Sequence, residues 1–192
     1  TLVPLVSKAV GDGFYKVSSQ ALVVSSQLLE VLKAKSDAVT AEVETLGTAA
    51  FDKLKGDVDQ EVKESAITAV STLLQLFPLG DKGTEMLGVL VDRVKNEATR
   101  LSAIKALRSV TESAHASALT PHLPALMPLV CEQLRKSSRA LKMASLQLLH
   151  AIFTHFAPQL SADASESAVA ALAPLVSDGD LQISQSTLKC LS

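Results

Sequence analysis

The sequence predicts an all-α fold in which a pair of helices is repeated along the chain. Of the 192 residues 47% are apolar, but only 3% are aromatic and Trp is absent, a composition that favours helices packed by aliphatic side chains. After an acidic turn, Val62, Ala66, Ile67 and Val70 form a narrow apolar stripe at the helical period. One helix cannot bury such a stripe alone, so the chain is expected to repeat it.

Ten helical segments are expected, and they fall into five antiparallel pairs. Asp57 or Asp59 should cap the helix that carries the stripe, because a carboxylate accepts hydrogen bonds from the free backbone N–H groups of a helix start. Pro78 and Gly80 should end that helix. The expected pairs are 2–10 with 14–33, 40–55 with 60–77, 84–95 with 97–111, 123–134 with 139–156, and 163–176 with 181–192.

The second helices align with one another on the stripe. Their starting positions 17, 62, 99, 141 and 183 lie 45, 37, 42 and 42 residues apart, and periods near 40 with two helices per unit are typical of HEAT or armadillo repeats. An Asp five residues before the starting position, as Asp57 stands before Val62, favours the HEAT type. A proline eight residues before the turn, as Pro4 stands before Asp12, also favours it.

We therefore interpret the whole chain, 1–192, as a single HEAT-repeat α-solenoid. The repeats are placed at about 1–35, 36–79, 80–115, 116–159 and 160–192, with the outer two incomplete. Because the first residues already lie in an apolar-periodic helix, the chain is expected to be a piece of a longer solenoid. The uncharged runs 113–131 and 143–162 contain prolines or scattered polar residues and are not interpreted as membrane spans.

The sequence gives no sign of catalysis or of a cofactor. His150 and His155 are five apart on one helix, so they point to different faces and should not share a metal ion. Neither a phosphate-binding glycine loop following a strand nor a Gly-x-Ser-x-Gly elbow is present. Cys131 and Cys190 sit in apolar helical patterns and are interpreted as buried free thiols in a reducing compartment.

Charge is concentrated in the middle of the chain, although the formal net charge is only −2. Residues 92 to 142 contain nine basic and four acidic side chains. One interpretation is a solvated helix face, and the other is a basic patch on the concave side that meets an acidic partner. Arg100, Arg139 and Lys142 are the candidates for protein binding because they begin second helices. Nucleic acid is a weaker alternative because aromatic stacking residues are scarce.

Four blocks of this chain resemble, in order and spacing, the cullin-associated, neddylation-dissociated (Cand) family. They are VGDGFYKV at 10–17, DQEVKE at 59–64, RVKNEATRL at 93–101 followed by KAL at 105–107, and LRKSSRALK at 134–142. Together they extend the resemblance over nearly the whole chain. The connection at 35–39 looks shorter than in the family, and Gly13 stands where the family often has proline.

The resemblance implies the central segment of a long HEAT solenoid that wraps around a cullin and its RING subunit. Such proteins bind unmodified cullins, hinder neddylation and promote exchange of substrate-receptor modules in cullin–RING (SCF-type) ubiquitin ligases. They have no active site and no cofactor, and no nucleic acid, membrane or small-molecule partner is implied. We expect a cytoplasmic and nuclear location and a monomeric segment. No individual contact residue is carried over from the family.

Other protein-binding solenoids remain as alternatives. A HEAT-repeat nuclear transport receptor would be expected to have acidic concave helices, whereas the middle of this chain is basic. A microtubule-binding array is disfavoured by the absence of Trp. An enzyme is the least favoured class.

Overall fold

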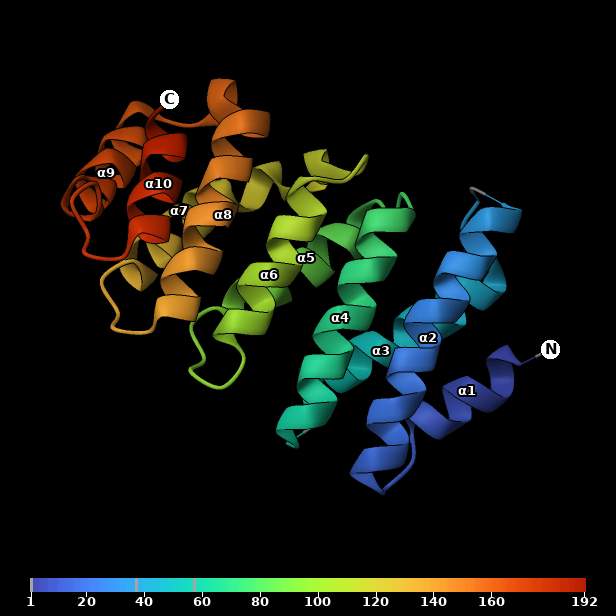
Figure 1. Cartoon of the computed structure of the whole chain (residues 1–192). Helices are drawn as coiled ribbons and strands as arrows, with labels where there is room; N and C mark the ends of the chain where they lie inside the picture. The colour runs from blue at the N-terminus through green and yellow to red at the C-terminus, as the bar shows by residue number, and fades with distance from the viewer. Residues whose placement is uncertain (1, 37, 57) are drawn as a thin grey trace.

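The computed structural model describes residues 2–36, 38–56 and 58–192, and in these ranges the chain is a row of helices without a β-strand (Figure 1). Turns join consecutive helices, and most helices pack against the one before or after them in the sequence. The α-helices are α1 (Val3–Val10), α2 (Tyr15–Lys35), α3 (Ala41–Gly56), α4 (Gln60–Leu76), α5 (Asp81–Arg93), α6 (Arg100–Thr111), α7 (Leu123–Gln133), α8 (Arg139–Phe156), α9 (Ala162–Leu172) and α10 (Leu181–Leu191); three 3-10 helices are η1 (Ala116–His122), η2 (Ala157–Gln159) and η3 (Ala173–Leu175).

The helices form two layers. In Figure 1, α2, α4, α6, α8 and α10 lie side by side in chain order from right to left, and each packs against the next. In the other layer α1 contacts α3 and α7 contacts α9, while η1 contacts both α5 and α7. This arrangement is an α-solenoid, as the sequence predicted. Within the described ranges, no helix combines the length and the apolar character needed to span a bilayer.

The apolar stripe of α4 lies in the core between the layers. Val62, Ala66, Ile67 and Val70 are each at most 1% exposed. The residues that align with Ile67 in the next two second helices, Ile104 and Leu146, are fully buried as well. The two layers pack closely at Gly47 of α3, where a Cβ atom would lie 2.6 Å from the Leu73 Cδ2 atom.

The outer helix pairs differ from the inner ones. Val17 in α2 is 40% exposed, and Leu188 and Leu191 in α10 are 51% and 42% exposed, although the aligned positions of the inner repeats are buried. Within this segment α2 and α10 each pack against one neighbouring second helix, whereas α4, α6 and α8 pack against two. Aligning the second helices on the apolar stripe therefore overestimates how far the side chains of α2 and α10 are buried in this segment.

Helix boundaries agree with the sequence pattern to within three residues at most ends. In the third pair Gly80 adopts φ 56° and α5 starts at Asp81, three residues earlier than the pattern predicts. A left-handed backbone of this kind favours glycine. The first helix of the fifth pair, α9, is also shorter than expected, because Pro174 lies in η3 directly after it. The division into five numbered repeats remains a prediction.

Candidate protein-binding surface

The second helices α4, α8 and α10 begin with side-chain caps that fix the turns before them. One Asp59 carboxylate oxygen accepts hydrogen bonds from the backbone N–H groups two and three residues further on, at 2.9 and 3.2 Å. Asp180 does the same at 2.9 and 3.3 Å, and Ser138 accepts one bond at 3.3 Å. Each cap satisfies N–H groups that have no partner inside the helix. Asp59 is thus the cap of α4, and Asp57 lies outside the described residues.

A cleft of about 650 Å³ opens at the starts of α4 and α6 and at the turn before α8. Its wall is largely polar and includes three cations and two glutamates. The charged residues that line the cleft are Glu64, Glu97, Arg100, Lys105 and Lys136. Ser138 lines it as well. A cleft with three cations and two carboxylates can bind a segment that is acidic overall.

Arg100 is held at the edge of this cleft by a neighbouring helix. Its Nη1 atom donates to the Gln133 side-chain oxygen of α7 at 3.4 Å, and Gln133 in turn donates to the Leu129 carbonyl at 3.0 Å. The Arg100 Nε atom is buried and makes no hydrogen bond within the described residues. The bond to Gln133 therefore orients the guanidinium group, and its Nε donor is turned away from solvent.

Two lysines complete the cationic wall. Lys105 is exposed on α6, and Lys136 forms an ion pair with Glu132 at 3.1 Å. Both side chains of that pair are about half exposed, so solvent screens it and the pair is weak. Both lysines belong to the basic region of residues 92 to 142, but they are not among the predicted binding residues. Their place in a cleft depends on the packing of three repeats, which the sequence does not show.

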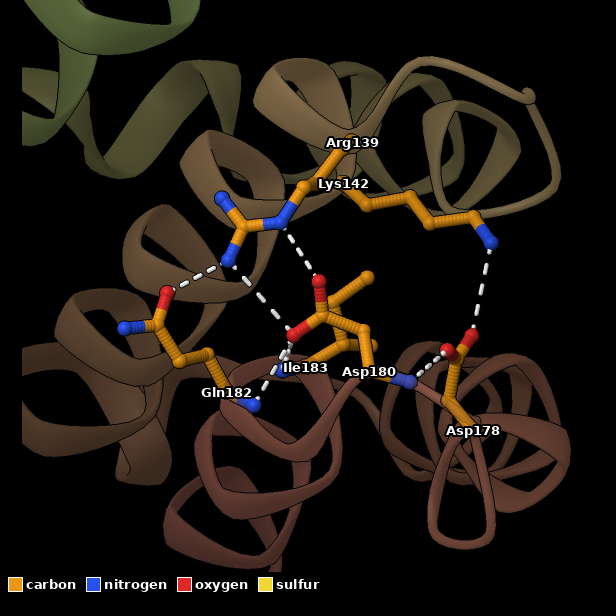
Figure 2. Close-up of polar contacts among 6 residues, drawn as sticks. All are labelled: Arg139, Lys142, Asp178, Asp180, Gln182 and Ile183. Atoms are coloured by element: carbon orange, nitrogen blue, oxygen red, sulfur yellow. Dashed lines mark hydrogen bonds and ion pairs between the residues drawn. The ribbon is translucent and has the colours of Figure 1, made fainter.

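Arg139 and Lys142 lie outside the cleft and bind the next repeat (Figure 2). Arg139 donates to the Asp180 carboxylate and to the Gln182 side-chain oxygen, while the Lys142 amino group lies 3.5 Å from an Asp178 oxygen. Hydrogen bonding to Arg139 holds the pKa of Asp180 below its usual value, and the same carboxylate raises the pKa of Arg139. These pairs couple α8 to the turn before α10.

The three predicted binding residues thus have two different environments. Arg100 lines the cleft, whereas Arg139 and Lys142 are engaged in contacts with their own chain. The acidic partners of Arg139 and Lys142 lie 41 and 36 residues further along the chain, close to one repeat period. That spacing is the signal in the sequence that could have indicated the pairing. Whether these residues bind another protein remains a prediction.

The titratable groups of the described ranges form no metal centre. No group of three or more His, Cys, Asp or Glu side chains there is arranged to hold a metal ion. Cys131 and Cys190 are free thiols. Burial raises the pKa of both, for Cys190 to about 11, which suppresses the reactive thiolate.

The stacked helix pairs define the class of protein, a helical-repeat scaffold of the armadillo and HEAT type. A computationally designed armadillo repeat protein for modular peptide recognition superimposes with a TM-score of 0.71, at 16% identity, over 99% of this chain and 80% of that one. A designed armadillo repeat protein in complex with a (KR)4 peptide gives the same TM-score at 15% identity, with the same coverage. At this identity the likeness shows the fold alone, and it confirms the predicted solenoid.

Sequence similarity identifies the particular family. The family described as CAND1-like, TPR repeats matches residues 1–70. Cullin-associated NEDD8-dissociated protein 1 of Drosophila melanogaster is 38% identical over 201 residues, which cover 100% of this chain and 16% of that protein. Cullin-associated NEDD8-dissociated protein 2 of Rattus norvegicus is 37% identical, and the match covers 96% of this chain and 15% of that protein. Cullin-associated NEDD8-dissociated protein 1 of Arabidopsis thaliana is 32% identical, and the match covers 94% of this chain and 15% of that protein.

The chain belongs to the cullin-associated NEDD8-dissociated family, which confirms the resemblance found in the sequence. It spans less than a fifth of the length of the curated relatives that it matches.

Proposed function

We propose that this chain is a non-catalytic scaffold segment of a regulator that binds a cullin and its RING subunit. In this proposal the whole protein sequesters unmodified cullin–RING cores, hinders neddylation and promotes exchange of substrate-receptor modules in SCF-type ubiquitin ligases. The observation that carries the proposal is the similarity of the entire chain to proteins named for cullin association. A cytoplasmic and nuclear location is part of the same proposal, and imaging of the tagged full-length protein tests it.

The cationic cleft is the surface through which this segment would contribute. Arg100 lines the cleft, and Lys105 and Lys136 add positive charge beside it. Complementary charge raises the rate of association with an acidic surface and adds specificity. Arg139 and Lys142 are satisfied within the chain, so the cleft is the stronger candidate for contact with a partner.

The direct test is capture of unmodified and NEDD8-modified cullin by the full-length protein. The proposal expects capture of the unmodified form and much weaker capture of the modified one. Equal capture of both forms, or capture of neither, would contradict it. The isolated segment is not suited to this experiment, because it spans less than a fifth of the relatives' length and is expected to bind weakly.

A charge reversal in the full-length protein then tests the cleft. Arg100→Glu with Lys105→Glu should slow association with unmodified cullin at least about tenfold at low salt, and less as salt screens the charges. Lys53→Glu with Lys55→Glu on α3 changes the net charge equally at a place away from the cleft and serves as the matched control. An equal effect in both variants would show that total charge matters and the cleft does not.

Arg139→Glu with Lys142→Glu reports on structure instead of binding. Sequence reasoning predicts little effect on folding, because exposed charges contribute little. The structure changes this expectation, since both new carboxylates would face Asp180 and Asp178. Hydrogen exchange should therefore accelerate in α10 and remain unchanged in α4. Unchanged exchange in α10 would show that the two ion pairs do not anchor it.

A further inference from the structure

The turn between α7 and α8 carries an exposed serine surrounded by cations. Ser138 caps α8 and is exposed. Arg135 and Lys136 stand three and two residues before it, and Arg139 follows it directly. This arrangement matches what basophilic Ser/Thr protein kinases accept, because their acidic subsites bind cations two and three residues before the target hydroxyl.

Capping of α8 does not require these cations, as the next helix pair shows. Ser161 caps α9 in the same way, accepting from the Ala164 N–H at 3.2 Å, and it is also exposed. No basic residue lies within three positions of Ser161. The two serines have the same structural role and differ in their charged surroundings.

The structure also provides a place for a phosphate on Ser138. The serine lines the same cleft as Arg100, Lys105 and Lys136, and its oxygen already faces the Leu141 N–H at the start of α8. A phosphoserine at the start of a helix and beside cations gains charge-assisted hydrogen bonds. At Ser161 the neighbouring residues in the sequence add no cation to the helix terminus.

We propose that Ser138 is a phosphorylation site for a basophilic Ser/Thr protein kinase, and that its phosphate occupies the cationic cleft. The kinase transfers the γ-phosphoryl group of ATP: a bond forms between the Ser138 Oγ atom and phosphorus, and the bond to ADP breaks. The hydroxyl proton passes to the catalytic base of the kinase. Because the wall holds three cations and two glutamates, the bound dianion makes the cleft net negative and closes it to an acidic segment. This inference holds whichever partner the solenoid binds.

Phosphate incorporation is the first test. The folded full chain is incubated with ATP and the catalytic subunit of a basophilic kinase, and peptides are sequenced by mass spectrometry. Close to one phosphate per chain is expected on Ser138 and none on Ser161. Ser138→Asn, which keeps a capping side chain, should abolish incorporation, whereas Ser137→Ala should leave it unchanged. No incorporation, or comparable incorporation on Ser161, overturns the proposal.

Two further measurements test the role of the cations. Arg135→Ala should lower the initial rate of incorporation at least about tenfold, and an unchanged rate refutes recognition of this turn. The phosphorylated chain should melt a few degrees higher than the unmodified chain. With Arg100→Ala and Lys105→Ala present, most of that rise should disappear. A rise that persists in this variant shows that the phosphate does not occupy the cleft.

Discussion

Truncation of Ile67 is the most direct probe of how the solenoid is held together. The side chain is 1% exposed between the two layers, and Ile67→Ala removes three carbon atoms from it. At about 0.8 kcal/mol for each buried carbon the lost transfer free energy is about 2.4 kcal/mol, and the cavity left behind adds to it. We therefore expect the free energy of unfolding to fall by about 2–5 kcal/mol.

The chain contains a matched control for this truncation. Leu188 occupies the aligned position in α10 but is 51% exposed. Leu188→Ala removes the same number of carbon atoms from a side chain that is half in water and leaves no enclosed cavity. Its expected cost is about 1 kcal/mol.

Thermal and urea unfolding followed by circular dichroism at 222 nm measure the two variants. At about 2–4 °C per kcal/mol for a chain of this size, Ile67→Ala should lower the Tm by roughly 4–20 °C and Leu188→Ala by a few degrees. Equal losses in both variants would refute the reasoning that stacking on both sides determines burial. A loss below about 1 kcal/mol for Ile67→Ala would refute its place in the core.

Three other predictions concern packing, thiol reactivity and pH. Gly47→Ala should destabilise the chain by about 1–3 kcal/mol in urea titrations, because its Cβ atom would lie 2.6 Å from a Leu73 methyl group. Gly56→Ala, at the end of the same helix with open space around it, should have a much smaller effect. Burial raises the pKa of Cys190 to about 11, so at pH 8 a thiol reagent should label it at least about tenfold more slowly in the folded chain than in urea; equal rates would contradict its burial. The pKa of Asp180 is lowered from 3.8 by its hydrogen bond from an arginine, so the stabilisation is present above pH 3.8 and is lost as the pH falls through the lowered value. Hydrogen exchange in α10 should accelerate in that range, and Asp180→Asn, which keeps the capping oxygen, should remove this pH dependence.

Periodicity in the sequence was enough to predict the two-layer solenoid. The stripe at Val62 and Ile67 identifies the core face of α4, and its recurrence places the other second helices correctly. Periodicity did not predict how far the side chains of the outer helix pairs are buried. Val17 and Leu188 match the pattern as well as the inner residues do, and only the stacking of pairs in space shows that one side of each is uncovered.

The polar surface was less predictable than the core. Arg100, Arg139 and Lys142 were selected together because all three lie at or near the start of second helices, but the structure separates them. Arg139 reaches Asp180 because α8 and α10 lie side by side, and that contact depends on the orientation of two helices as well as on spacing. The cleft likewise needs three consecutive repeats to assemble Arg100 and Lys136.

Stacking in chain order also determines how this chain can fold. The principal contacts of every helix are with its own pair or with an adjacent one, so the sequence separation of contacting residues never greatly exceeds one repeat. Low contact order of this kind favours fast folding, since few distant segments must meet before apolar surface is buried. Folding can begin at any pair and extend to its neighbours, because each pair needs only the adjacent one to bury its apolar face. In the isolated segment, α1 and α10 are therefore expected to unfold before the central pairs.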